Sequence, residues 1–88
     1  MKYLIINDSE STPLGDEQNL VKVFIEINDA GHVRREIGFD MANQIVHAYP
    51  SKNYRYGGYG IFDLVMFDTS SWESNLSKEE FEKRWENI

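Results

Sequence analysis

The feature that most constrains the fold is an alternating segment followed by a tight turn. Apolar and other residues alternate over 20–28, which is the period of an extended strand whose two faces differ. Residues 28–31 then fit a type I turn closed by Gly31, because glycine tolerates the positive φ that this position requires. A second strand over 32–39 completes an antiparallel hairpin. The sequence therefore predicts a β-sheet built around these two strands.

The turn also predicts the register of the hairpin, because the cross-strand pairs follow by counting outward from it. The predicted pairs are Asn28 with His32, Ile27 with Val33, Glu26 with Arg34, Val23 with Ile37 and Val21 with Phe39. In this register apolar side chains meet one another and a carboxylate meets a guanidinium, combinations that stabilise neighbouring strands. Arg35 then interrupts the face of Val33, Ile37 and Phe39. It either reaches water at a sheet edge or, with Asp63, forms an ion pair or a partner-facing patch.

The other elements complete an α+β fold. We predict an antiparallel meander of about four strands drawn from residues 2–6, 20–28, 32–39, 44–49 and 61–67, packed against a C-terminal helix over 78–87. The segment 41–48 also suits a short helix. We favour a strand because Ile45 and Val46 are adjacent β-branched residues and Pro50 follows closely. At this length, residues 1–88 are expected to form one small domain.

The start of the C-terminal helix has the clearest local signal. Ser77 is suited to cap the first turn, and Glu80 three residues later completes a capping box. Phe81, Trp85 and Ile88 recur at helical spacing and form one apolar stripe. A helix this short does not persist alone in water, so the stripe is expected to lie on a face of the sheet.

Charge and composition exclude several classes of protein. Nine Lys and Arg against fifteen Asp and Glu give a net charge of −6, which argues against general binding to nucleic acids or anionic membranes. No apolar run approaches the roughly 20 residues of a membrane span, and residues 1–20 lack the pattern of a secretory signal. Without cysteine, neither a disulfide framework nor a thiolate zinc site is expected. These features predict a soluble, cytoplasmic protein.

Residues with catalytic or metal-binding potential are few. There is no cysteine nucleophile, and no serine lies in a Gly-x-Ser-x-Gly motif. His32 and His47 are a conceivable acid–base pair, but a structural contact of His47 with Arg35 or Glu36 on the neighbouring strand is favoured. No metal-binding or phosphate-binding motif occurs. The sequence thus predicts neither an enzyme nor a cofactor.

Two polar loops hold the candidate binding residues. The first loop, 7–19, carries the carboxylates Asp8, Glu10, Asp16 and Glu17. The second loop, 51–60, and the strand after it supply Tyr54, Arg55, Tyr56, Tyr59 and Asp63. Tyrosine and arginine are enriched at protein interfaces, so a protein partner is favoured. The alternatives are stacking of the tyrosines on single-stranded nucleic acid and packing of the tyrosines onto the domain's own core.

Three stretches of the chain are similar to those of a known group of proteins. They are IEINDAGHVRREI at 25–37, YGGYGIFD at 56–63 and EEFEKRW at 79–85. The chain resembles immunity proteins of contact-dependent growth inhibition and related polymorphic toxin systems of bacteria. These proteins have no catalytic motif, so the resemblance carries over no residue by position. It implies a cytoplasmic protein, monomeric when free, that forms a 1:1 complex with one cognate toxin domain.

The acidic charge fits this implied role. Many such toxins are nucleases, and a nuclease cleft is basic because it must neutralise phosphates. Carboxylates of the first loop would steer the inhibitor to that cleft, and aromatic side chains of the second loop would form the desolvated centre of the interface. We therefore expect inhibition of a nuclease, with a ribonuclease favoured. The alternative is a small module that binds single-stranded nucleic acid, or acts in regulation, through residues 52–60.

Overall fold

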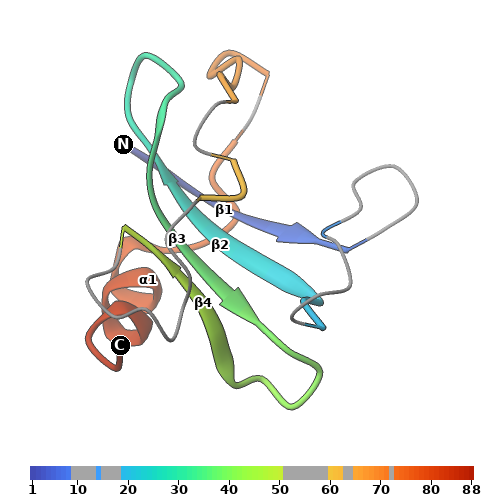
Figure 1. Ribbon diagram of the computed structural model, residues 1–88. Coiled ribbons are helices and arrows are strands. Elements are labelled where there is room, and N and C mark those ends of the chain that lie inside the picture. The colour runs from blue at the N-terminus through green and yellow to red at the C-terminus, as the bar shows by residue number, and fades with distance from the viewer. Residues whose placement is uncertain (9–13, 15–18, 51–59, 63–64, 72) are drawn as a thin grey trace.

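The fold is an open antiparallel sheet followed by one helix. The computed structural model describes residues 1–8, 14, 19–50, 60–62, 65–71 and 73–88. The elements are β1 (Lys2–Asn7), β2 (Lys22–Ile27), β3 (Val33–Phe39), β4 (Ile45–Tyr49) and α1 (Lys78–Trp85). Each strand pairs with the next along the chain, so the sheet has the order β1-β2-β3-β4 (Figure 1). The predicted α+β fold is confirmed, and within the segment 41–49 the favoured strand is present.

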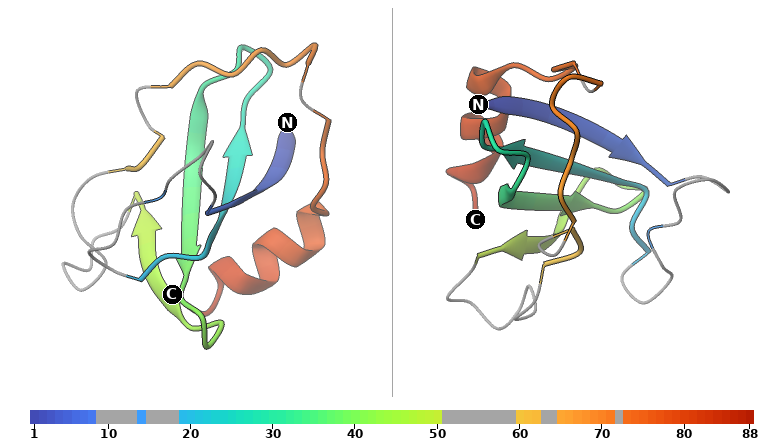
Figure 2. Two further views of the ribbon diagram at one scale, coloured as in Figure 1. Left: turned by 90° about the vertical axis from the view of Figure 1, so that its right-hand side faces the viewer. Right: turned by 90° about the horizontal axis from the view of Figure 1, so that it is seen from above.

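Apolar side chains cover both faces of the sheet, and α1 lies against one of them (Figure 2). The buried cluster on the helix side consists of Tyr3, Phe24, Ile37, Phe39 and Phe81. The cluster on the other side consists of Leu4, Ile6, Leu14, Leu20, Val23, Ile25, Ile27 and Phe67. β2 contributes to both clusters and is therefore buried on both faces. Each fully buried apolar side chain of this size stabilises the fold by about 1.5–3 kcal/mol, so the apolar residues of β2 make a large contribution to stability.

The hairpin of β2 and β3 contains a bulge that the predicted register lacks. Ile27 pairs with Val33 as expected, but Glu26 pairs with Arg35 instead of Arg34 because the register shifts between Glu26 and Ile27. Arg34 is the extra residue on β3. All pairs beyond the bulge are displaced by one residue: Phe24 lies opposite Ile37, Val23 opposite Gly38 and Lys22 opposite Phe39. The predicted Glu26–Arg34, Val23–Ile37 and Val21–Phe39 pairs are therefore wrong.

The bulge decides which side chains face α1. Arg35 joins Ile37 and Phe39 on the helix side of the sheet, as expected. Val33, which an uninterrupted strand would place on that same side, packs instead against the opposite cluster. Glu26 and Arg35 are thereby brought side by side on the helix-facing surface.

The segment 61–67 is not a strand in its described residues, so this predicted element is wrong. Met66 forms an isolated antiparallel bridge with His32, and the N–H of Phe67 donates to the carbonyl oxygen of Gly31 at 2.8 Å. Gly31 has a φ of +92°, and a Cβ there would lie 2.0 Å from the carbonyl oxygen of Phe67, so only glycine fits. Residues 66 and 67 thus contact the end of the hairpin and do not extend the sheet.

Polar residues that precede α1 close the outer edge of β1. The N–H of Tyr3 donates to Oγ of Ser74 at 3.2 Å, and the N–H of Ile5 donates to Oδ1 of Asn75 at 2.8 Å. The N–H of Asn75 donates to the carbonyl oxygen of Tyr3 at 3.2 Å. An edge satisfied in this way offers little to a further strand. These bonds also fix the point from which the chain enters α1.

α1 begins as predicted and ends two residues earlier than expected. Oγ of Ser77 accepts a hydrogen bond from the N–H of Glu80 at 3.1 Å, which is half of the expected capping box. Phe81 is fully buried against the sheet and Trp85 is partly buried, but Ile88 lies beyond the helix and is exposed. No helix in the described part of the chain has the length and apolar character needed to cross a membrane.

Candidate functional site

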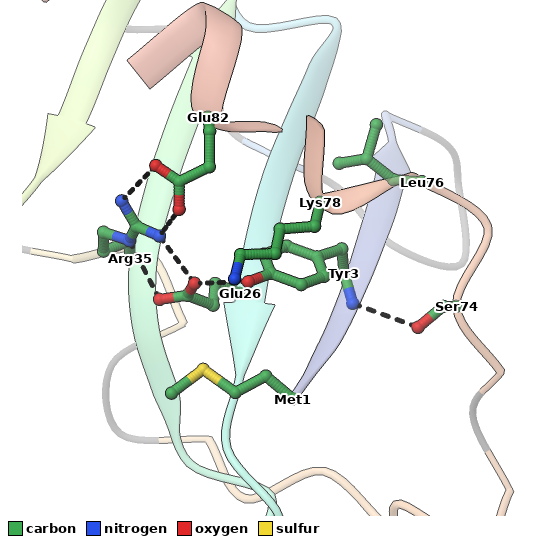
Figure 3. A pocket seen from close by; sticks show the side chains of 8 residues that line it. All are labelled: Met1, Tyr3, Glu26, Arg35, Ser74, Leu76, Lys78 and Glu82. Atoms are coloured by element: carbon green, nitrogen blue, oxygen red, sulfur yellow. Dashed lines mark hydrogen bonds and ion pairs between the residues drawn. The ribbon is translucent and has the colours of Figure 1, made fainter. Parts of the chain in front are cut away.

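A hollow of about 680 Å³ lies beside α1 on the helix side of the sheet. It is lined by Met1, Tyr3, Glu26, Arg35, Ser74, Leu76, Lys78 and Glu82 (Figure 3). Four of these residues, Tyr3, Glu26, Arg35 and Glu82, are joined by hydrogen bonds and are called the Arg35 cluster below. The cluster connects β1, β2, β3 and α1.

Arg35 lies between two carboxylates in this cluster. Its Nε and Nη2 donate to Oε1 and Oε2 of Glu26 at 2.8 and 2.6 Å. Its Nη1 donates to Oε2 of Glu82 at 3.2 Å, and Nη2 also contacts Oε1 of Glu82. The guanidinium lies over the rings of Phe81 and Trp85, 4.9 and 5.0 Å from their centroids. Arg35 thus holds a β2 carboxylate and α1 at once.

Tyr3 completes the cluster from β1. Its hydroxyl donates to Oε2 of Glu26 at 2.8 Å, and its ring centroid lies 5.4 Å from that of Phe81. Burial, aided by the bond to Glu26, raises the pKa of Tyr3 to about 12. Hydrogen bonds from Arg35 hold the pKa values of Glu26 and Glu82 below their ordinary value, against the opposing effect of burial. The cluster is therefore most stable with both carboxylates ionised and the phenol neutral.

These pKa shifts predict how stability depends on pH. The unfolded chain takes up protons at Glu26 and Glu82 near their ordinary pKa of 4.5, before the folded chain does, so stability falls as the pH drops below that value. The unfolded Tyr3 loses its proton near pH 10 and the folded one near 12, so stability also falls as the pH rises through this range. Urea unfolding measured across pH tests both limits. Tyr3→Phe is expected to reduce the alkaline loss, and an unchanged loss would contradict the assignment.

A second buried polar group lies at the pairing of β3 with β4. Oε1 of Glu36 contacts Nε2 of His47 at 2.8 Å and accepts the N–H of Ile61 at 2.7 Å. Oε2 of Glu36 accepts the N–H of Phe62 at 2.6 Å. The side chains of Glu36 and His47 are 0% and 4% exposed, so these contacts are almost free of competition from water. Glu36 thereby attaches residues 61–62 to the sheet.

Gly38 makes room for this arrangement. Gly38 pairs with His47 across the β3–β4 ladder, and a Cβ at Gly38 would lie 2.7 Å from Cβ of His47 and 2.5 Å from Cδ2 of Leu20. The favoured prediction, a structural contact of His47 with Arg35 or Glu36, is confirmed with Glu36 as the partner.

The two histidines do not meet. Gly38, the partner of His47, lies six positions after His32 along the chain, which corresponds to roughly 20 Å of extended strand. His32 is exposed and His47 is buried, so the geometry does not support an acid–base pair between them. Among the described residues, no group of three or more His, Asp or Glu is placed to hold a metal ion.

Most of the predicted binding residues lie outside the described part of the chain. These are Glu10, Asp16, Glu17, Tyr54, Arg55, Tyr56, Tyr59 and Asp63. Asp8 is described and exposed, and its Oδ1 accepts the N–H of Leu14 at 2.9 Å, within the first loop. The conceivable partner of Arg35, Asp63, is among the undescribed residues, whereas Glu26 and Glu82 are seen to bind Arg35.

The described cations are largely engaged within the molecule. Four of the seven make internal contacts: Arg35 as above, Lys2 to the carbonyl oxygen of Thr69, Lys22 over Phe24 and Phe39, and Arg84 over Phe39 and to the carbonyl oxygen of Asn43. Seven of the eleven described Asp and Glu residues are exposed: Asp8, Asp29, Asp68, Glu73, Glu79, Glu80 and Glu86. Among the described residues, the charge exposed to solvent is therefore negative.

Comparison of the chain with known protein families, with curated proteins and with solved structures found no match.

Proposed function

We propose that the chain is an immunity protein that binds one cognate toxin domain in the cytoplasm and neutralises it. The toxin is a nuclease, a ribonuclease in particular, and the inhibitor acts by covering its basic cleft in a 1:1 complex, with no catalysis of its own. The observation that carries this proposal is the uneven exposure of charge. Seven of the eleven described carboxylates are exposed to solvent, against three of the seven described cations.

Uneven exposure matters because association depends on the charges that a partner meets. Of the seven described cations only Arg34, Lys78 and Lys83 are exposed, against seven exposed carboxylates. A surface of this kind attracts a cationic protein at long range and repels nucleic acid. This supports a protein partner with a basic surface over direct binding to RNA or DNA. An active-site cleft that holds phosphates is such a surface.

Two loops supply the proposed contact residues. In the first loop they are Asp8, Glu10, Asp16 and Glu17, and in and after the second they are Tyr54, Arg55, Tyr56, Tyr59 and Asp63. Two described features bear on these loops. Asp8 bonds the backbone of Leu14 inside the first, and Glu36 bonds the backbone of residues 61–62 directly after the second.

The test is inhibition of the toxin domain encoded beside the gene for this chain. We expect RNA cleavage by that domain to stop at a 1:1 ratio, with a complex of that stoichiometry on size-exclusion chromatography. Cleavage that continues unchanged, with no complex formed, would contradict the proposal. A salt-dependent gel shift with single-stranded RNA in that case would favour the nucleic-acid module instead.

A pair of matched variants locates the contact. Asp16→Lys with Glu17→Lys changes the first loop, and Glu79→Lys with Glu80→Lys makes the same change of charge on exposed positions of α1. If the first loop meets the toxin, the loop variant is expected to weaken binding by 10-fold or more, roughly 1.4 kcal/mol, and the α1 variant by less. Equal effects would show that net charge alone matters and would contradict the placement of the contact in the first loop.

A further inference from the structure

α1 is attached to the rest of the described chain by side chains. The backbone hydrogen bonds of its residues are made within the helix and its caps, such as Phe81 to Ser77 and Glu86 to Glu82. The residues just before it are different, because Ser74 and Asn75 are bonded to the backbone of β1. The firmly held part of this segment therefore ends at residue 75, one residue before Leu76 and the cap.

Phe81 is the only buried residue among those described in α1. Phe81 is fully buried, whereas Leu76 and Trp85 are only partly buried against the same cluster. A helix of eight residues is too short to persist alone in water, so its helical state depends on this contact with the sheet. We therefore expect α1 to unfold whenever Phe81 separates from the sheet.

In the described part of the chain, two polar contacts hold α1, one of them weakened by solvent and the other by an unpaired donor. Glu82 reaches Arg35, but the side chains are 34% and 21% exposed, so solvent competes for the pair. Near the C-terminal end, Arg84 donates to the carbonyl oxygen of Asn43 at 3.0 Å, yet its Nε is buried without a hydrogen-bond partner among the described residues. A buried donor left unpaired disfavours the docked position. Both contacts are thus weaker than those of the sheet.

From these observations we infer that α1 opens from the sheet as a separate unit, about a hinge at residues 76–77, and that the Arg35–Glu82 contact holds it closed. Opening exposes the apolar surface of Phe24, Ile37 and Phe39, while β1 to β4 stay paired. Regions with few backbone bonds to their neighbours and solvent-accessible contacts are those that open locally in native proteins. The inference concerns the fold and does not depend on the proposed function.

Amide hydrogen exchange of the intact chain, followed residue by residue by NMR near neutral pH, tests this inference. In the wild type, amides 82–86 are expected to exchange at least about 10-fold faster than the paired amides of β2 and β3. Glu82→Gln removes the negative charge on the helix side of the contact and leaves Arg35 bonded to Glu26 and stacked on Phe81 and Trp85, so exchange in α1 is expected to rise up to about fivefold with β2 and β3 unchanged. Glu79→Gln, an exposed residue of the same helix, is the matched control and should change neither rate.

Two results would overturn the inference. Equal protection of α1 and of β2 and β3 in the wild type would show that the helix opens only when the whole chain unfolds. An effect of Glu82→Gln that is absent, equal to that of Glu79→Gln, or spread equally over helix and sheet would remove the role given to the Arg35–Glu82 contact.

Discussion

Replacing Glu36 by glutamine is expected to lower the free energy of unfolding by about 3 kcal/mol. The carboxylate of Glu36 faces three nitrogen atoms, Nε2 of His47 and the backbone N–H groups of Ile61 and Phe62. A glutamine side chain has one acceptor oxygen and one NH₂ group, so at least one buried donor is left facing another donor. The side chain is fully buried, which leaves no water to relieve this conflict. Urea denaturation followed by circular dichroism measures the loss.

The control for this change is the same substitution at an exposed glutamate. Glu79→Gln is expected to lie within about 0.5 kcal/mol of the wild type, because Glu79 is exposed on α1. A second measurement concerns the attached segment. The amides of Ile61 and Phe62 should lose protection from hydrogen exchange in Glu36→Gln before the amides of β2 do. If Glu36→Gln behaves like the control, the attachment of residues 61–62 by Glu36 is wrong.

The parts of the fold that the sequence predicts are those decided by neighbouring residues. Residues 28–31 specify a turn whatever surrounds them, and Oδ1 of Asn28 accepts the N–H groups of Ala30 and His32 at 3.0 Å in the structure. Ser77 likewise caps α1 through a bond to Glu80, three residues away. The strand at β4 follows from adjacent β-branched residues and a nearby proline. Local signals of this kind predict the turn, the start of α1 and the strand at β4 correctly, and with them the α+β fold.

The bulge in β3 could not be predicted because two arginines are adjacent. A carboxylate at Glu26 is satisfied equally well by Arg34 or Arg35 as long as only the hairpin is considered. The choice is made by residues far along the chain, since Glu82 and the ring of Phe81 both contact Arg35. Pairing of this kind depends on the tertiary structure, so the alternation of apolar and polar residues within 20–39 does not predict the bulge.

The segment 61–67 was misassigned for a related reason. Its apolar residues suit a strand, but the backbone N–H groups of Ile61 and Phe62 bond the carboxylate of Glu36 instead of a neighbouring strand. The signal available in the sequence was Glu36 itself, because it is a charged residue directly before the apolar end of a strand. In the structure, residues 36–39 are all buried. A buried carboxylate requires donors, and loop backbone is a common source of them. The same reasoning would have singled out Glu26, which interrupts the apolar run of β2.

The structure does not test the predicted binding loops. Eight of the nine proposed contact residues lie outside the described residues, so their role rests on sequence chemistry and on the exposed negative charge. The polar residues that the structure does bring together, in the Arg35 cluster and at Glu36 and His47, join elements of the fold to one another. We therefore assign those groups to stability and leave binding to the exposed carboxylates and loops.

Replacing Arg35 by methionine is expected to destabilise the fold by about 3 kcal/mol, while Arg34→Met stays within about 0.5 kcal/mol of the wild type. Both changes remove one positive charge and keep an unbranched side chain. Only Arg35 is bonded to Glu26, whose side chain is 7% exposed and would keep just the Tyr3 hydroxyl as a partner. Arg34 is exposed, and its charge has a smaller effect on the pKa of Glu26 than burial or the contacts with Arg35 and Tyr3. Comparing the two variants therefore shows which arginine bonds Glu26, and so where the bulge lies, as well as how strongly the Arg35–Glu26 contact stabilises the fold.

The stability of these variants at acidic pH tests the Arg35 cluster independently. The depressed pKa values of Glu26 and Glu82 give the wild type stability above their ordinary value of 4.5 that is lost as the pH falls through the folded pKa values. Arg35→Met has no guanidinium to hold these carboxyls ionised, so its stability deficit should be largest near pH 7 and shrink below about pH 4. Urea denaturation of both variants at a series of pH values measures the deficit. A larger loss for Arg34→Met than for Arg35→Met would instead indicate the uninterrupted register with Arg34 opposite Glu26. A deficit of Arg35→Met that does not change with pH would contradict the role given to the ionised carboxylates.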